Sequence, residues 1–229
     1  LGQLDAAPVS CPASQHGCLA VTAATTEAEP LDTSRFPYLS LIGCLLWTTI
    51  TRPDVSVAVS RACQHSKTPT KAHWRVAIRI LRYLLCTSSL RLTYARSVRP
   101  ITVVAYADAA FANEPRSRSR YGHAIYLSGC LVTWLTKATT AVCLSTAEVE
   151  YAAATEATKD VLWLRNLLGE LGFHQHSASR LLEDNQACVA MVRNHVVSGR
   201  NRHFCVKMDW LRQQVHDEIV QLEFVASRN

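Results

Sequence analysis

Three acidic residues occupy positions from which carboxylates could act together. Asp108 follows the apolar run ITVVA in the stretch YADAAF, Glu150 lies in LSTAEVEYAAA, and Asp184 lies in LLEDNQA. A buried, unpaired carboxylate is costly, so Asp108 taken alone is most simply an acid at a strand end or in a turn. Acids that converge repel one another unless cations hold them, and Mg²⁺ and Mn²⁺ prefer carboxylate oxygens. Two such ions about 4 Å apart are a common device for cleaving phosphodiesters, so the chemistry depends on whether the fold brings the three acids together.

The segments that carry these acids have the pattern of a sheet with helices packed on it. Three stretches of strand character follow one another with short polar or glycine-containing connections, which predicts an antiparallel meander over 101–108, 121–128 and 130–138. A long helix begins near Ser145, where Glu148 completes a capping box, and it ends at Gly172. A strand, two helices and a last strand follow at 177–184, 185–194, 201–218 and 219–227. This order predicts an α/β fold, a mixed five-stranded sheet flanked by helices.

The predicted strand order places the three acids at one edge of the sheet. If the first and fourth strands are parallel neighbours joined by the long helix, their carboxyl ends meet where open α/β sheets bind ligands. We expect Asp108 to end the first strand and Asp184 to end the fourth. Glu150 then lies in the second turn of the helix, within reach of the same edge. The sequence therefore predicts a three-acid site for divalent cations.

The chain divides into segments of different charge. Residues 1–35 carry a net charge of −3, are rich in Ala, Thr, Ser and Pro, and read as a linker or a loosely ordered arm. Residues 36–100 carry a net charge of +9 and form three helical stretches, whereas residues 101–229 are neutral and carry the predicted sheet. A basic segment beside a neutral module is typical of a surface that contacts phosphates.

The last helical stretch of the basic segment carries a stripe of cations. Lys71, Arg75, Arg79 and Arg82 recur at intervals of four, four and three residues, which places them on one helix face. Such a face is either a solvated surface or a nucleic-acid contact. The lack of interleaved acids favours nucleic acid, because phosphates would relieve the repulsion between like charges.

The remaining features bound the class of protein. No apolar run is long enough to predict a membrane span. The chain begins with Leu and lacks a targeting pattern, so we expect an internal piece of a longer polypeptide. The nine cysteines are scattered without a C-x-x-C pair, which indicates reduced intracellular thiols rather than a disulfide framework. His174 and His176 have no cysteine placed to complete a zinc tetrahedron with them.

Several motifs occur together and in order. The stretches YADAAF, LSTAEVEYAAA and LLEDNQACVAMV resemble the ribonuclease H domain of copia-type LTR retrotransposon Pol polyproteins. The earlier stretches YLSLIGCLLWTTITRPDVSVAVS and HWRVAIRILRYLLCT resemble the region that connects the reverse transcriptase to that domain. APVSCP near the start and GRNRHFCVKMDWLRQQV near the end fit the same pattern. The resemblance covers nearly the whole chain and is to the C-terminal part of such polyproteins.

The resemblance implies a fold and an activity. The fold would be ribonuclease H-like, truncated at its C-terminus and preceded by a small helical connection segment. Asp108, Glu150 and Asp184 match the family's catalytic acids, which would hold two Mg²⁺ or Mn²⁺ ions. The implied reaction is hydrolysis of the RNA strand of RNA–DNA hybrids during retrotransposon reverse transcription. Recognition would use the backbone and the 2′-hydroxyl, so the expected sequence preference is weak.

The resemblance also implies partners, together with differences from the family pattern. Asn185, Gln186 and His203 fall at positions implied to approach the nucleic acid. The expected partners are an RNA–DNA hybrid and the rest of the Pol polyprotein, reverse transcriptase and integrase, in a cytoplasmic particle or the nucleus and without a membrane. Ala110 stands where the family has a second aspartate, and the family's fourth acid falls past Asn229. The alternative function is therefore a catalytically decayed, nucleic-acid-binding remnant of the same polyprotein.

Overall fold

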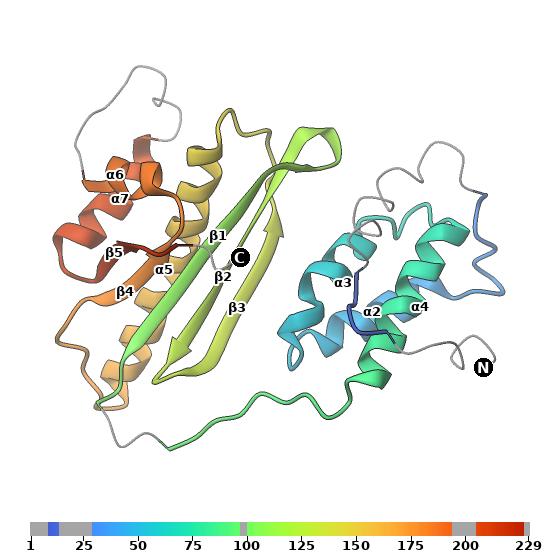
Figure 1. Cartoon of the computed structure of the whole chain (residues 1–229), viewed down its shortest axis with the longest axis horizontal. Coiled ribbons are helices and arrows are strands. Elements are labelled where there is room, and N and C mark those ends of the chain that lie inside the picture. Colours follow the sequence, from blue (N-terminus) through green and yellow to red (C-terminus); the bar gives the residue numbers. More distant parts are fainter. Residues whose placement is uncertain (1–8, 14–28, 97–99, 194–204, 227–229) are drawn as a thin grey trace. The chain divides into compact units, whose positions relative to one another are not determined.

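The computed structural model describes residues 9–13, 29–96, 100–193 and 205–226, with the backbone alone for 205–207 (Figure 1). The chain divides into two compact units, which we call the N-terminal unit, Leu1–Leu92, and the C-terminal unit, Thr93–Asn229. Within the described residues, no helix combines the length and the apolar character that crossing a membrane would require. Each unit has its own hydrophobic core, so each is described by itself.

The N-terminal unit is a small helical bundle. Its elements are the helices α2 (Tyr38–Thr48), η1 (Pro53–Val55), α3 (Ser56–Cys63) and α4 (Lys71–Cys86). Helix α4 begins after Thr70, whose hydroxyl accepts a bond from the His73 backbone N–H while the His73 ring accepts one from the Thr70 N–H. Its inward positions, which include Ala77 and Ile80, pack with Tyr38 and Ile42 of α2. The helical segment predicted before the sheet is therefore present.

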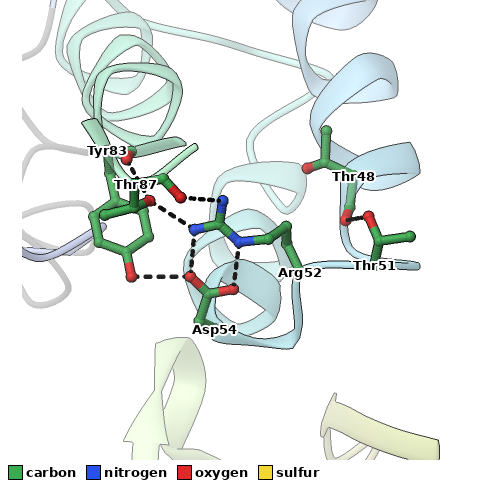
Figure 2. Close-up of polar contacts among 6 residues, drawn as sticks. All are labelled: Thr48, Thr51, Arg52, Asp54, Tyr83 and Thr87. Atoms are coloured by element: carbon green, nitrogen blue, oxygen red, sulfur yellow. Dashed lines mark hydrogen bonds and ion pairs between the residues drawn. The ribbon is translucent and has the colours of Figure 1, made fainter. Parts of the chain in front are cut away.

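An arginine joins two helical elements of this unit (Figure 2). The Arg52 guanidinium donates to both carboxylate oxygens of Asp54 at 2.9 and 2.7 Å. It also donates to the backbone carbonyl and hydroxyl of Thr87, at the C-terminal end of α4, at 3.1 and 2.7 Å. The Tyr83 hydroxyl completes the network by donating to Asp54 at 2.9 Å. Such charge-assisted, bidentate bonds have defined geometry, so they fix the start of η1 against the end of α4.

The segment expected to be a linker or loose arm packs on the helices at two points. Val9 and Leu31 are buried, and both belong to the core of the N-terminal unit. Pro30 forms an isolated antiparallel bridge with Thr70, and Lys71 pairs with Glu29 at 2.6 Å. The apolar side chains of the segment explain this packing, because burying them against the core removes apolar surface from water.

The C-terminal unit is built on one mixed sheet (Figure 1). Its strand order is β3-β2-β1-β4-β5, in which β1–β2 and β2–β3 are antiparallel while β1–β4 and β4–β5 are parallel. The strands are β1 (Val103–Glu114), β2 (Arg118–Leu127), β3 (Cys130–Ala138), β4 (Ser179–Glu183) and β5 (Val220–Phe224), with a short turn of helix, η2 (Pro115–Ser117), between β1 and β2. The predicted α/β fold class, a mixed five-stranded sheet flanked by helices, is confirmed.

Three helices complete this unit: α5 (Thr146–Glu170), α6 (Gln186–Arg193) and α7 (Cys205–His216). Helix α5 is the crossover between β3 and β4, and its inward face of small residues, including Ala153, Ala154 and Ala157, packs on β1 and β2. The Tyr151 hydroxyl donates to the Met208 carbonyl at 2.8 Å, which ties α5 to α7. Because these inward residues are small, α5 can lie close to the sheet. This packing sets the distance between the first turns of α5 and β1.

Candidate metal centre

The parallel pairing of β1 with β4 defines the edge at which the acids meet. The pairing runs from Val104 with Arg180 to Ala107 with Glu183, the last residue of β4. Asp108 is the residue that follows the last pair on β1, and Asp184 is the residue that follows it on β4. The two aspartates therefore leave the parallel ladder at the same level, as expected for neighbouring parallel strands.

The expectation that Asp108 ends its strand is wrong. Strand β1 continues to Glu114, because its antiparallel ladder with β2 extends beyond Asp108 through Ala110 opposite Arg120. Only the parallel partner β4 stops at this level. Asp108 thus lies within β1 and is paired with β2 on one side. On its other side the ladder with β4 has ended, which leaves the sheet open next to Asp184.

Glu150 is positioned by the start of α5. The Ser145 hydroxyl accepts a bond from the Glu148 backbone N–H at 3.2 Å, and the Glu148 carboxylate accepts one from the Leu144 N–H at 2.7 Å. The predicted capping box is present with its second bond shifted by one residue. This cap starts the helix at Thr146 and places Glu150 in the second turn, where it is only 4% exposed.

The three acids converge in space. One carboxylate oxygen from each of Asp108, Glu150 and Asp184 lies within 4.8 Å of the others. Asp108 is exposed and Asp184 partly exposed, whereas Glu150 is buried and its Oε2 atom has no hydrogen-bond partner in the described part of the chain. The donor set suits a divalent cation, because hard cations prefer carboxylate oxygens and the buried oxygen lacks any other partner.

The electrostatics of the cluster follow from this crowding. Burial, reinforced by the negative charge of Asp184, raises the pKa of Asp108 above its usual range. Burial and then the charges of Asp108 and Asp184 raise the pKa of Glu150. Perturbed acids that share a cluster are typical of functional sites, and a bound cation would reverse both shifts by favouring the ionised forms.

A fourth carboxyl group, Glu183, was missed by the sequence reasoning. It is 0% exposed, and its carboxyl group lies beside that of Glu150. Burial and then the charge of Glu150 raise its pKa. The available signal was its strand position, because side chains alternate along a strand and Glu183 shares the inward parity of Leu181.

The predicted nucleic-acid contacts of the C-terminal unit have local roles as well. The Asn185 side chain accepts a bond from the Cys188 backbone N–H at 3.0 Å, which caps the start of α6 beside Asp184. Gln186 is exposed at the first position of that helix. His203, the third such residue, lies outside the described residues.

The predicted cationic stripe lies on α4 of the N-terminal unit. Lys71 and Arg75 are exposed, and Arg79 and Arg82 are partly buried, while the core-facing positions of the helix are other residues. The charge of Lys71 is partly neutralised by its ion pair with Glu29. Arg75 is therefore the most open cation of the stripe.

The chain has clear relatives among known proteins, although no family model matches it. It is 35% identical over 221 residues, 95% of its length, to the retrovirus-related Pol polyprotein from transposon TNT 1-94 of Nicotiana tabacum. It is 27% identical over 227 residues, 99% of its length, to the corresponding polyprotein from transposon RE2 of Arabidopsis thaliana. The chain spans only 16% and 15% of the length of these two relatives.

A structural likeness accompanies these matches. The solved chain of LC11-RNase H1, in complex with an RNA/DNA hybrid, has a TM-score of 0.42 and 14% identity, covering 56% of this chain and 86% of that one. The sequence relatives, rather than this likeness, establish the family. The motifs around Asp108, Glu150 and Asp184 and the matches over nearly its whole length show that the chain belongs to the copia-type retrotransposon Pol polyproteins, of which it represents a segment.

Proposed function

We propose that the chain is a ribonuclease H-type endonuclease that hydrolyses the RNA strand of RNA–DNA hybrids during retrotransposon reverse transcription. The observation that carries the proposal is the convergence of Asp108, Glu150 and Asp184 within 4.8 Å at the end of the parallel strand pair. Membership of the Pol polyproteins supplies the setting, since reverse transcription produces such hybrids. The chain's own residues supply the site.

The three acids divide the work according to their exposure. Glu150 is held by the second turn of α5 and is buried, so its carboxylate is fixed in place and shielded from water. Asp108 and Asp184 reach solvent, so a phosphate of the substrate can approach them. Fixed ligands cost no reorganisation during the reaction, which is the usual advantage of a preorganised site.

The residues fit two Mg²⁺ or Mn²⁺ ions as cofactors. When bound, such ions would activate a water molecule and stabilise the leaving oxygen of the phosphodiester. Asp108, Glu150 and Asp184 would hold them, and the unpartnered Oε2 atom of Glu150 gives a ligand that nothing else in the described chain satisfies. Asn185 helps indirectly, because its cap on α6 fixes the chain that follows Asp184.

Binding of the hybrid would use cations and exposed polar groups. Gln186 lies two residues from Asp184 and is open to solvent, which suits contact with a sugar or phosphate. Lys71, Arg75, Arg79 and Arg82 of the N-terminal unit provide a basic helix face for the phosphate backbone. Reverse transcriptase and integrase segments of the same polyprotein are the proposed neighbours.

The test is a comparison of substrates that carry a label on each strand. We expect the full chain, with Mn²⁺ or Mg²⁺, to cut the RNA strand of an RNA–DNA hybrid and to leave its DNA strand, double-stranded DNA and single-stranded RNA intact. Chelator should abolish the cutting. If the hybrid is bound in a salt-dependent manner but never cut, the activity is lost and the chain is a nucleic-acid-binding remnant. If both strands are cut equally, the ribonuclease H assignment is wrong.

A further inference from the structure

Glu183 is the most completely buried acid of the C-terminal unit for which the structure provides no partner. Its side chain is 0% exposed, and neither of its carboxylate oxygens makes a hydrogen bond of ordinary geometry with the described residues, although the Asn185 backbone N–H and the Glu150 carboxyl group are nearby. None of the ion pairs of the described residues includes it. A buried carboxyl group left in this way is strongly unfavourable, so such a group indicates a proton or an ion that satisfies it.

The position of Glu183 points to the ion. It is the last residue of β4, paired with Ala107 of β1 and Phe224 of β5, so its place is fixed from both sides by the sheet. Its carboxyl group lies in contact with that of Glu150, whose Oε2 atom is also buried and unpartnered. The next residue along the chain is Asp184, a member of the three-acid cluster.

The acids around Glu150 differ in exposure. Asp108 and Asp184 reach solvent, whereas Glu150 and Glu183 are buried. Glu183 lies beside Glu150 but is not one of the three acids whose oxygens gather within 4.8 Å. A cation bound beside Glu150 would also attract the Glu183 carboxylate, and no basic side chain of the described residues pairs with either buried acid.

We propose that Glu183 is a fourth carboxylate of the cation site, which acts on the bound ion from the buried side together with Glu150. The inference rests on the proposed function, because it assigns a residue to the same site. The competing explanation is that Glu183 is a neutral acid that only fills space in the core.

The substitution Glu183→Gln separates the two explanations. Glutamine has nearly the same size and is neutral, so it replaces a neutral acid without loss but cannot replace a carboxylate ligand. We expect titration of the full chain with Mn²⁺, followed by calorimetry or by the spin-resonance signal of free Mn²⁺, to show about 10- to 100-fold weaker binding in E183Q than in the wild type. A smaller rise in melting temperature with Mn²⁺ should accompany it.

Two matched variants make the outcome specific. Glu156→Gln removes an acid from α5 that pairs with Lys159 rather than with the cluster, and we expect wild-type Mn²⁺ affinity. Asp108→Asn removes a member of the cluster, and we expect Mn²⁺ binding to be lost. If the wild type binds no more Mn²⁺ than D108N, the cation site and with it the proposed function are wrong. If D108N loses binding while E183Q binds as the wild type does, only the role of Glu183 is refuted.

A second variant covers the case in which E183Q does not fold. Glu183→Leu removes every polar atom and matches the neighbouring Leu181 and Leu182, and replacing buried charges by apolar groups is often neutral or stabilising. Its Mn²⁺ affinity should fall as far as that of E183Q. Unchanged affinity in either folded variant contradicts the proposal.

Discussion

At the scale of single residues, the environment of each carboxyl group decides what it can do. Glu150 is 4% exposed and lies among other acids, so its negative charge is unfavourable until a cation arrives. Asp108 and Asp184 retain access to solvent. In the proposed function, the buried acid would make the site depend on a metal ion, and the two open acids would leave room for the substrate to approach.

The raised pKa of Glu150 predicts how stability without metal depends on pH. In the folded chain the proton is held above the usual glutamate value of 4.5, because of burial and then the charges of Asp108 and Asp184. The folded state therefore binds more protons than the unfolded state above that pH, so the free energy of unfolding should fall as the pH rises from there toward the raised value. Each unit of pKa difference is worth about 1.4 kcal/mol.

Denaturant unfolding in chelator at a series of pH values checks this prediction. Glu150→Gln should flatten the pH dependence, whereas Glu156→Gln, on the same helix, should leave it as in the wild type. Saturating Mn²⁺ should also remove the decline, because a bound cation favours the ionised carboxylates. A wild-type stability that rises with pH over this range would show that Glu150 is not held protonated by its surroundings.

The residues of the candidate site could be predicted only where they lie within a family motif. Asp108, Glu150 and Asp184 were identifiable because each sits in a stretch of family character, and the cluster brings all three together. Glu183 was not, because in LLED it is only the residue before Asp184, the acid that matches the family motif. Its importance comes from burial and from its contact with Glu150, which depend on tertiary packing.

At the scale of elements, the network around Arg52 links η1 to the end of α4 in the N-terminal unit (Figure 2). Its side chain is 13% exposed and makes four hydrogen bonds to Asp54 and Thr87. Arg52→Ala leaves these acceptors without their donor, and we expect the free energy of unfolding of the unit to fall by about 2–3 kcal/mol. Hydrogen exchange of amides in α3 and α4, followed by mass spectrometry, reports this loss.

A matched variant tests whether the loss comes from the network. Arg75→Ala removes the same charge from the exposed face of α4, where it has no such bonds, and stability should change by about 0.5 kcal/mol or less. Equal losses in the two variants would mean that net charge, rather than the Arg52 bonds, sets the stability of the unit.

The sheet is close-packed directly opposite Asp108. Gly122 of β2 pairs with Asp108, and a Cβ atom at this glycine would lie 2.7 Å from the backbone carbonyl oxygen of Leu135 on β3. Gly122→Ala must push these strands apart, so we expect about 1–3 kcal/mol of destabilisation in the C-terminal unit. Thermal unfolding and Mn²⁺ titration measure the two consequences, because displacement of β2 also disturbs Asp108.

The control for this variant is a glycine with free space around it. A Cβ atom at Gly43, in α2, would meet nothing within 4 Å. Gly43→Ala should therefore be neutral or stabilise the chain by up to about 1 kcal/mol, since alanine favours the helix. A Gly122→Ala variant as stable as Gly43→Ala would show that β2 and β3 are not locked at this point.

The elements themselves were largely predictable, and their ends were not. Stretches of strand character identified all five strands, and the cap at Ser145 identified the start of α5. The exception is β1, which continues to Glu114 because β2 pairs with it beyond Asp108. The length of β1 depends on how far β2 pairs with it. That extent cannot be read from the sequence of β1 alone.

At the scale of the whole molecule, charge and chemistry are divided between two segments. The basic stripe lies in the N-terminal unit and the acidic cluster in the C-terminal unit. The proposed division of labour is that the first binds the phosphate backbone and the second cuts it. The segment boundaries predicted from charge, 36–100 and 101–229, remain predictions of how the polyprotein is organised.

This division predicts separate effects on binding and on cleavage. Arg75→Gln should weaken hybrid binding about equally for different sequences and reduce the slope of log affinity against log salt by about one. A fluorescence-anisotropy titration at several salt concentrations measures that slope. Glu156→Gln, which removes a partly exposed charge of opposite sign, should leave the slope unchanged or steepen it. An unchanged slope in Arg75→Gln would remove the α4 stripe from the nucleic-acid surface.

The most direct measurement is cleavage of a hybrid labelled on its RNA strand by the full chain and by its Asp184→Asn variant, in Mn²⁺. Asparagine keeps the shape of the side chain and removes one carboxylate of the cluster, so binding of the hybrid should persist while cleavage falls by about 1,000-fold or more, a loss of about 4 kcal/mol of transition-state stabilisation. Cleavage by the wild type that chelator abolishes and Asp184→Asn lacks is the predicted result. Equal cleavage by both proteins would contradict the assignment of the three acids as the active site.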